Sequence, residues 1–116
     1  MSPLKITARD AATGPVLEIS GELDYDSAPE LRELIPAVTL RPGQCLTLDL
    51  GGMEFCDSSG LSALIAAHNH AQAARADVAL AAVPAHTLRT LRIVGLDQVF
   101  LIRPGADTGP EVRESS

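Results

Sequence analysis

Two adjacent serines lie where a predicted strand gives way to a predicted helix, within the segment Asp57-Ser58-Ser59-Gly60-Leu61. A strand that leads through a turn into a helix places the first turn of that helix at the carboxyl edge of a sheet. The free amide groups of this turn, and the positive end of the helix dipole, favour an anion. A phosphate attached to Ser58 or Ser59 would therefore meet favourable electrostatics on its own chain.

The same residues also suit a purely structural role. Asp-Ser-Ser-Gly is ordinary turn chemistry. An Asp or Ser just before a helix commonly accepts a hydrogen bond from a free amide, which makes it the N-cap. Spacing alone favours this second interpretation, in which Asp57 or Ser58 is the cap of the following helix.

The side chains that could serve as a general base are badly placed for either serine. A nucleophile elbow needs a glycine two residues before its serine, and position 56 is Cys56. His68 and His70 lie two to three helical turns beyond Ser58, roughly 15 Å or more along the axis, too far for a base. We expect His68 to lie on the apolar face of the helix and His70 in solvent. The sequence predicts no catalytic residue and no enzyme.

Metal and cofactor sites are not indicated either. A His-x-His pair on a helix points its two rings roughly 200° apart, which is poor geometry for one metal ion. Gly51-Gly52 is not followed by the Gly-Lys-Ser or Gly-Lys-Thr of a phosphate-binding loop. Four aspartates could converge on a divalent cation without any spacing that enforces it: Asp24, Asp26, Asp49 and Asp57. We predict no metal and no cofactor.

The composition argues against nucleic acid as a partner. The chain has 116 residues and a formal net charge of -6 at pH 7, with 9 Lys and Arg against 15 Asp and Glu. Affinity for a phosphate backbone comes mainly from clustered basic residues. Here Lys5 is the single lysine, and the arginines are scattered. An acidic surface fits solubility or a basic protein partner.

The sequence gives no indication of export or membrane insertion. Residues 1–5 lead into a strand pattern rather than an apolar signal segment, and no apolar run approaches the ~20 residues of a membrane helix. Cys45 and Cys56 form no Cys-x-x-Cys pair, and two cysteines are too few for a disulfide framework. We expect a soluble cytoplasmic protein with reduced, mostly buried thiols and no membrane partner.

Alternating apolar and polar residues predict the strands that position the serines. The predicted strands are residues 4–9, 16–20, 45–50, 78–83 and 99–102, with a turn at 10–15 and a loop at 51–57. The first two strands form a hairpin, and the strand at 45–50 is central. The continuous apolar run at 78–83 is expected to be buried on both faces.

Three helices are predicted between these strands. The first begins at Ser27, which has the spacing of a capping box with Glu30, and Pro36 should kink or end it. The second runs from residue 58 to about 76, and the third runs from Pro84 to Gly95. The expected inward positions are Leu31, Leu34, Ile35 and Val38, then Leu61, Leu64, Ile65 and His68, then Leu88, Leu91 and Val94.

This order of elements predicts one α/β domain. Helices that alternate with strands imply a mixed, mostly parallel central sheet of about five strands, with the antiparallel hairpin at its start and helices packed against it. The domain should span residues 1–103. Residues 104–116 are rich in Gly, Pro and charge and are expected to form a flexible tail.

Two motifs in register resemble the STAS-domain family of bacterial anti-sigma-factor antagonists. Gly21-Glu22-Leu23-Asp24 is similar to the family's Gly-Glu-Leu-Asp signature. Leu48-Asp49-Leu50 followed by Phe55-Cys56-Asp57-Ser58-Ser59-Gly60-Leu61 is similar to its strand, phosphorylation loop and helix start. Pro84, Leu88, Gly95-Leu96 and Phe100 follow the pattern of its last helix and strand. The resemblance extends from residue 4 to residue 103.

The resemblance implies a phosphorylation switch. Such a protein binds an anti-sigma factor that is also an ATP-dependent serine kinase, and thereby releases the sigma factor. The kinase phosphorylates the first serine of the motif, here Ser58, the phosphorylated form no longer binds, and a serine phosphatase restores it. The implied partner-binding residues are Asp24, Tyr25, Asp57, Ser58, Ser59, Gly60 and Leu61, with Gly60 allowing a partner's backbone to approach closely.

Two other functions remain open on the sequence. A STAS domain could serve as a scaffold or ligand-sensing module of a larger signalling complex without direct control of a sigma factor. The first turn of the helix at Ser58 could also bind a nucleotide or another small anion.

Overall fold

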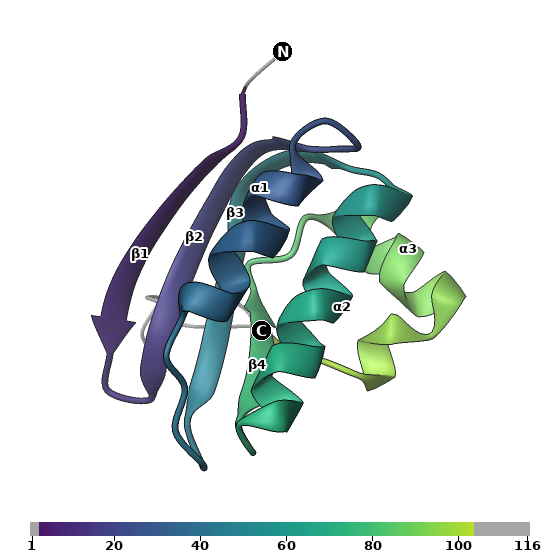
Figure 1. Ribbon diagram of the computed structural model, residues 1–116. Coiled ribbons are helices and arrows are strands. Elements are labelled where there is room, and N and C mark those ends of the chain that lie inside the picture. Colours follow the sequence, from purple (N-terminus) through teal and green to yellow (C-terminus); the bar gives the residue numbers. More distant parts are fainter. Residues whose placement is uncertain (1–2, 104–116) are drawn as a thin grey trace.

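A computed structural model describes residues 3–103 of the chain, and the tail predicted at 104–116 lies outside the described residues (Figure 1). The elements in chain order are β1 (Lys5–Ala11), β2 (Gly14–Leu23), α1 (Ala28–Leu34), the 3₁₀ turn η1 (Ile35–Ala37), β3 (Cys45–Cys56), α2 (Ser58–Ala73), β4 (Asp77–Ala81), α3 (Ala85–Val94), the 3₁₀ turn η2 (Leu96–Gln98) and β5 (Leu101–Arg103). The predicted α/β fold is confirmed.

The strands lie in the sheet in the same order as in the chain, β1-β2-β3-β4-β5. β1 and β2 form the predicted antiparallel hairpin, and the other neighbouring strands are parallel. Each crossover helix moves the chain one strand along the sheet. α1 and α2 cover one face of the sheet, and α3 lies beside α2 (Figure 1).

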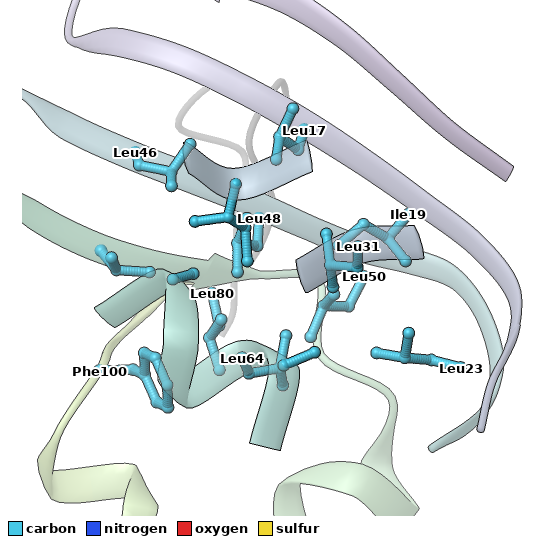
Figure 2. Close-up of a cluster of buried hydrophobic side chains, with 14 of the residues drawn as sticks. Leu17, Ile19, Leu23, Leu31, Leu46, Leu48, Leu50, Leu64, Leu80 and Phe100 are labelled. Atoms are coloured by element: carbon cyan, nitrogen blue, oxygen red, sulfur yellow. The ribbon is translucent and has the colours of Figure 1, made fainter. Parts of the chain in front are cut away.

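The core lies between this face of the sheet and the helices and consists mainly of leucine and alanine, since aromatic residues make up only 3% of the chain. Alternate residues of the strands point into it, and Figure 2 shows them meeting the helices. The labelled buried side chains are Leu17, Ile19, Leu23, Leu31, Leu46, Leu48, Leu50, Leu64, Leu80 and Phe100. Such full burial contributes about 1.5–3 kcal/mol for each large apolar side chain.

The predicted inward face of α2 is wrong in part. Leu64 is fully buried, whereas Leu61, Ile65 and His68 are only partly buried. The face that packs on the sheet carries small residues at helical spacing, namely Gly60, Ala63, Ala67 and Ala71. Small side chains let the helix lie close to the sheet, so the larger residues are displaced to the rim of the contact.

The predicted capping box at the start of α1 is also wrong. Ser27 occupies the N-cap position but makes no side-chain cap bond. Its hydroxyl points back toward β2 and donates to the carbonyl of Glu22 at 2.8 Å. The expected effect of Pro36 is confirmed, because α1 ends at Leu34 and gives way to the 3₁₀ turn.

One helical histidine and one residue at the end of α3 also differ from expectation. His70 is not in solvent, because its ring is partly buried with Nε2 2.8 Å from the carbonyl oxygen of Val38. Val94 is 55% exposed rather than inward. Gly95 ends α3 in the left-handed region at φ 83°, as predicted.

The segment predicted as a loop at 51–57 is largely strand. β3 continues to Cys56 and stays paired with β2 as far as Leu23, with register shifts along the way. Gly52 permits this close pairing, because a Cβ there would lie 2.8 Å from the Cβ of Ser20. Glycines and irregular register break the alternation that identifies a strand in a sequence.

Thr87 on α3 offers a test of the packing. Its Oγ1 is buried and has no hydrogen-bond partner among the described residues. Because an unsatisfied buried hydroxyl is costly, Thr87→Val should raise the free energy of unfolding by about 1 kcal/mol, measured by urea denaturation. Thr90→Val is the control on the same helix: Thr90 is exposed and donates to the carbonyl of His86, so no gain is expected. A loss of stability in Thr87→Val would show that its hydroxyl is satisfied.

Candidate functional site

The two sequence motifs meet at the carboxyl edge of the sheet. β2 and β3 are neighbouring parallel strands, and their last paired residues are Leu23 and Cys56. The chain leaves β2 through a turn at residues 24–27 and enters α1, and it leaves β3 through Asp57 and enters α2. Loops at the carboxyl ends of parallel strands are where α/β domains bind ligands and partners.

Asp57 is the N-cap of α2, so the cap interpretation holds for Asp57 rather than Ser58. One carboxylate oxygen, Oδ1, accepts a hydrogen bond from the amide of Gly60 at 3.0 Å. The other, Oδ2, accepts from the amide of Tyr25 at 3.1 Å. The Asp57 amide donates to the carbonyl of Leu23 at 3.3 Å. Asp57 therefore touches both loops of the site.

Ser58 is the first residue of α2, and it is exposed. Its carbonyl accepts a hydrogen bond from the Ser62 hydroxyl at 3.1 Å, one turn along the helix. Ser59 is only partly exposed. A phosphate on the Ser58 hydroxyl would lie at the positive end of a 16-residue helix, beside the carboxylate of Asp57.

Gly60 is buried where α2 passes the end of β2. A Cβ at this position would lie 2.6 Å from the carbonyl oxygen of Leu23 and 2.7 Å from Sγ of Cys56. The close approach that Gly60 permits is therefore between α2 and its own sheet. We expect Gly60 to support a partner surface from beneath rather than to contact a partner.

The turn after β2 is shaped by Asp24. Its Oδ1 accepts hydrogen bonds from the amides of Asp26 at 3.1 Å and Ser27 at 3.0 Å, and from the Ser27 hydroxyl at 3.0 Å. This network leaves the Tyr25 side chain 77% exposed. Leu61, by contrast, is partly buried against the core. Of the predicted partner-binding residues, Tyr25 and Ser58 are the most exposed.

The sequence interpretation missed Phe55 and an acidic hollow beside the site. Phe55 is 47% exposed near the end of β3, in a segment predicted as a loop. The hollow has a volume of about 480 Å³, and no Lys or Arg occurs among the described residues that line it: Pro3, Leu4, Glu22, Asp24, Asp26, Ser27 and Glu30. The dense carboxylates of residues 22–30 were the signal in the sequence that could have revealed it.

Cys56 is a poor nucleophile. Burial, and secondly the nearby Asp57 carboxylate, raise the pKa of its thiol from 9.0 to about 12. At pH 8 its thiolate fraction should be about 1000-fold below that of an ordinary thiol, so alkylation by iodoacetamide, followed by peptide mapping, should be correspondingly slow. The protein unfolded in urea is the control. Equally rapid alkylation of the folded protein would contradict the raised pKa of the Cys56 thiol.

The same shift makes stability depend on pH. The unfolded thiol ionises near pH 9.0 and the folded thiol near pH 12. Because the unfolded state loses its proton first, the free energy of unfolding should fall as the pH rises between these values.

Two further sequence expectations concern metals and membranes. Within residues 3–103, His, Cys, Asp and Glu side chains form no group of three or more that could hold a metal ion. In the same part of the chain, no helix is long and apolar enough to span a membrane. Both cysteines are free, with Cys45 buried and Cys56 partly buried.

Comparison with known proteins relates nearly all of the described residues to one family. A family model described as "Mlab, STAS domain" matches residues 6–103. The anti-sigma-F factor antagonist RsfB of Mycobacterium tuberculosis is 31% identical over 97 residues, covering 84% of this chain and 79% of RsfB. A "STAS-domain containing protein" of Pseudomonas aeruginosa is 29% identical over 101 residues, covering 85% and 99%. The crystal structure of an anti-sigma factor antagonist from Mycobacterium paratuberculosis superposes with a TM-score of 0.78 at 30% identity, covering 90% of this chain and 89% of that one.

Proposed function

Because the chain belongs to the STAS domain family, we propose that it acts as an anti-sigma-factor antagonist. In its unphosphorylated form it binds an anti-sigma factor, which then releases its sigma factor. Support comes from two relatives described as anti-sigma factor antagonists, which are 31% and 30% identical to this chain over most of both chains. The proposed domain spans residues 1–103, and it meets its partner in the cytoplasm.

The observation that carries this proposal is the geometry of Ser58. Its side chain is exposed at the first residue of α2. Asp57 joins this position to the exposed Tyr25 on the neighbouring loop. A kinase can therefore reach the hydroxyl, and a phosphate added there lies within the surface that a partner contacts.

The proposed partner is an anti-sigma factor with serine kinase activity, and a serine phosphatase reverses its action. The kinase transfers a phosphoryl group from ATP to the Ser58 hydroxyl, which adds about -1.5 to -2 charges at neutral pH. The chain is the substrate and supplies no catalytic group. Because a dianion is favourable at a helix N-terminus, release follows from phosphate bulk and charge at the interface rather than from unfolding.

The surface around Ser58 also suggests the chemistry of the partner. Tyr25 and Phe55 offer exposed aromatic rings, which commonly anchor protein interfaces. The acidic hollow contributes Glu22, Asp26 and Glu30. A partner that places Arg and Lys opposite the hollow, and an apolar patch opposite the two rings, is complementary to this part of the surface.

Direct binding tests the proposed function. The purified protein is titrated calorimetrically into each anti-sigma factor of the same genome, and displacement of the bound sigma factor is followed by size-exclusion chromatography. We expect one anti-sigma factor to bind and to release its sigma factor. The absence of binding to every folded, sigma-competent anti-sigma factor would contradict the proposal.

A second candidate is a STAS scaffold or ligand-sensing module without direct sigma control. The observation that favours it is the relative from Pseudomonas aeruginosa, which matches along 99% of its length and is described only by its domain. The two candidates differ in how they respond to phosphate. A scaffold should bind its partners equally well in the wild-type protein and in Ser58→Asp. A nucleotide ligand at 100 times its Kd would stabilise the folded protein by about 2.7 kcal/mol. Thermal denaturation would detect this as a higher melting temperature.

A further inference from the structure

We propose that Asp57 is a positioning residue that fixes Tyr25 relative to Ser58, so that the partner meets one preorganised surface. This inference rests on the proposed function, because it concerns the surface that the anti-sigma factor binds. It assigns Asp57 a role through Tyr25 rather than a direct contact with the partner.

The two carboxylate oxygens of Asp57 bind different parts of the chain. Oδ1 receives the Gly60 amide and caps α2, and Oδ2 receives the Tyr25 amide, 32 residues away in sequence. A serine or threonine cap has a single side-chain oxygen, so both amides would have to converge on one atom. A carboxylate at this position therefore does more than start the helix.

The turn that carries Tyr25 is shaped by local bonds. The Asp24 carboxylate accepts hydrogen bonds from the amides of Asp26 and Ser27. The Ser27 hydroxyl accepts a bond from the Asp24 amide at 2.9 Å and donates to the carbonyl of Glu22. The Ala28 amide donates to the Asp24 carbonyl at 2.7 Å. These bonds set the conformation of the turn but do not link it to α2. The bond from Tyr25 to Asp57 supplies that link.

Packing contributes little to the position of the Tyr25 side chain. It is 77% exposed, so few neighbouring atoms restrain it. Ordering such a side chain and its loop on binding costs free energy, and a surface that is already ordered avoids that cost. Loss of the Asp57 bond to Tyr25 should therefore weaken partner binding without removing any contact atom.

Asp57→Asn tests this role with little change in shape. Asparagine is a good N-cap, and its Oδ1 can still receive the Gly60 amide. Its Nδ2 then faces the Tyr25 amide, and two donors cannot bond. We expect about tenfold weaker binding to the anti-sigma partner, faster hydrogen exchange of the Tyr25 amide, and a melting temperature within a few degrees of the wild type.

A double-mutant cycle separates positioning from direct contact. In a Tyr25→Ala background, Asp57→Asn should change the Kd by less than about twofold, because its effect acts through Tyr25. Equal effects of Asp57→Asn with and without Tyr25 would overturn the proposal. Unchanged exchange of the Tyr25 amide in Asp57→Asn would overturn it as well. The exchange experiment uses the free protein, so it remains decisive for the bond even if no anti-sigma factor binds.

Discussion

Ser58→Ala should remain able to bind its anti-sigma partner in the presence of ATP, whereas the wild-type protein loses binding as phosphate accumulates. The Ser58 side chain is exposed at the first residue of α2, beside Asp57 and Tyr25. A dianion there adds negative charge to a surface that already carries Asp24, Asp57 and the acidic hollow. The phosphate also adds bulk at the interface, and its charge would face carboxylates of the partner that lie opposite Ser58. Since like charges brought together at an interface cost several kcal/mol, we expect the phosphorylated wild type to bind roughly 100-fold or more weakly. Calorimetry after incubation with kinase and ATP measures the difference.

Ser59→Ala is the matched control, because it removes the neighbouring hydroxyl from the same helical turn. It should be phosphorylated and inactivated like the wild type. The melting temperature of the phosphorylated wild type should stay close to that of the unmodified protein, since a helix N-terminus stabilises a phosphate. Inactivation of Ser58→Ala by ATP would assign the switch to another residue. A drop of many degrees on phosphorylation would indicate unfolding instead of interface repulsion.

Gly60→Ala should destabilise the fold by about 2 kcal/mol, although the same change in most helices is favourable. Alanine normally stabilises a helix interior by about 1 kcal/mol relative to glycine. Here its Cβ would lie 2.6 Å from the Leu23 carbonyl oxygen and 2.7 Å from the Cys56 sulfur. The start of α2 or the end of β2 must shift, and overpacking of this kind typically costs 1–3 kcal/mol. Urea denaturation gives the sign as well as the size of the effect.

Gly51→Ala makes the same chemical change at an exposed glycine. Its Cβ would lie 3.2 Å from Asp49 Oδ1 and 3.3 Å from the Ala82 Cβ, which is a tight fit but much less severe than the contacts at Gly60. We expect a change below about 1 kcal/mol. Stabilisation by Gly60→Ala would contradict the close packing of α2 against the end of β2. Because α2 carries Ser58, partner binding should weaken together with stability in Gly60→Ala only.

The elements that follow a clear periodicity could be predicted from the sequence. Leucines alternate at positions 46, 48 and 50, so the central strand was evident, and all three side chains are buried in the core. The change from strand to helix at Asp57 and Ser58 could likewise be predicted from local cap chemistry. These features depend on neighbouring residues alone.

What escaped prediction depends on contacts between distant residues. The extension of β3 beyond residue 50 relies on pairing with β2 across irregular register. Ser27 was expected to cap its own helix, but the carbonyl of Glu22 and the Asp24 carboxylate bind its hydroxyl instead. No spacing in the sequence indicates that Asp57 receives the Tyr25 amide, because that bond exists only once two loops meet at the sheet edge.

The proposed kinase-driven switch depends on phosphorylation of Ser58. Its most direct test is incubation of the purified protein with ATP and each anti-sigma kinase of the same genome, followed by intact mass measurement and peptide mapping. We expect one of these kinases to add one phosphate, located at Ser58. An unmodified protein in every reaction, with each kinase shown to be active on another substrate, or a phosphate located elsewhere, would contradict it.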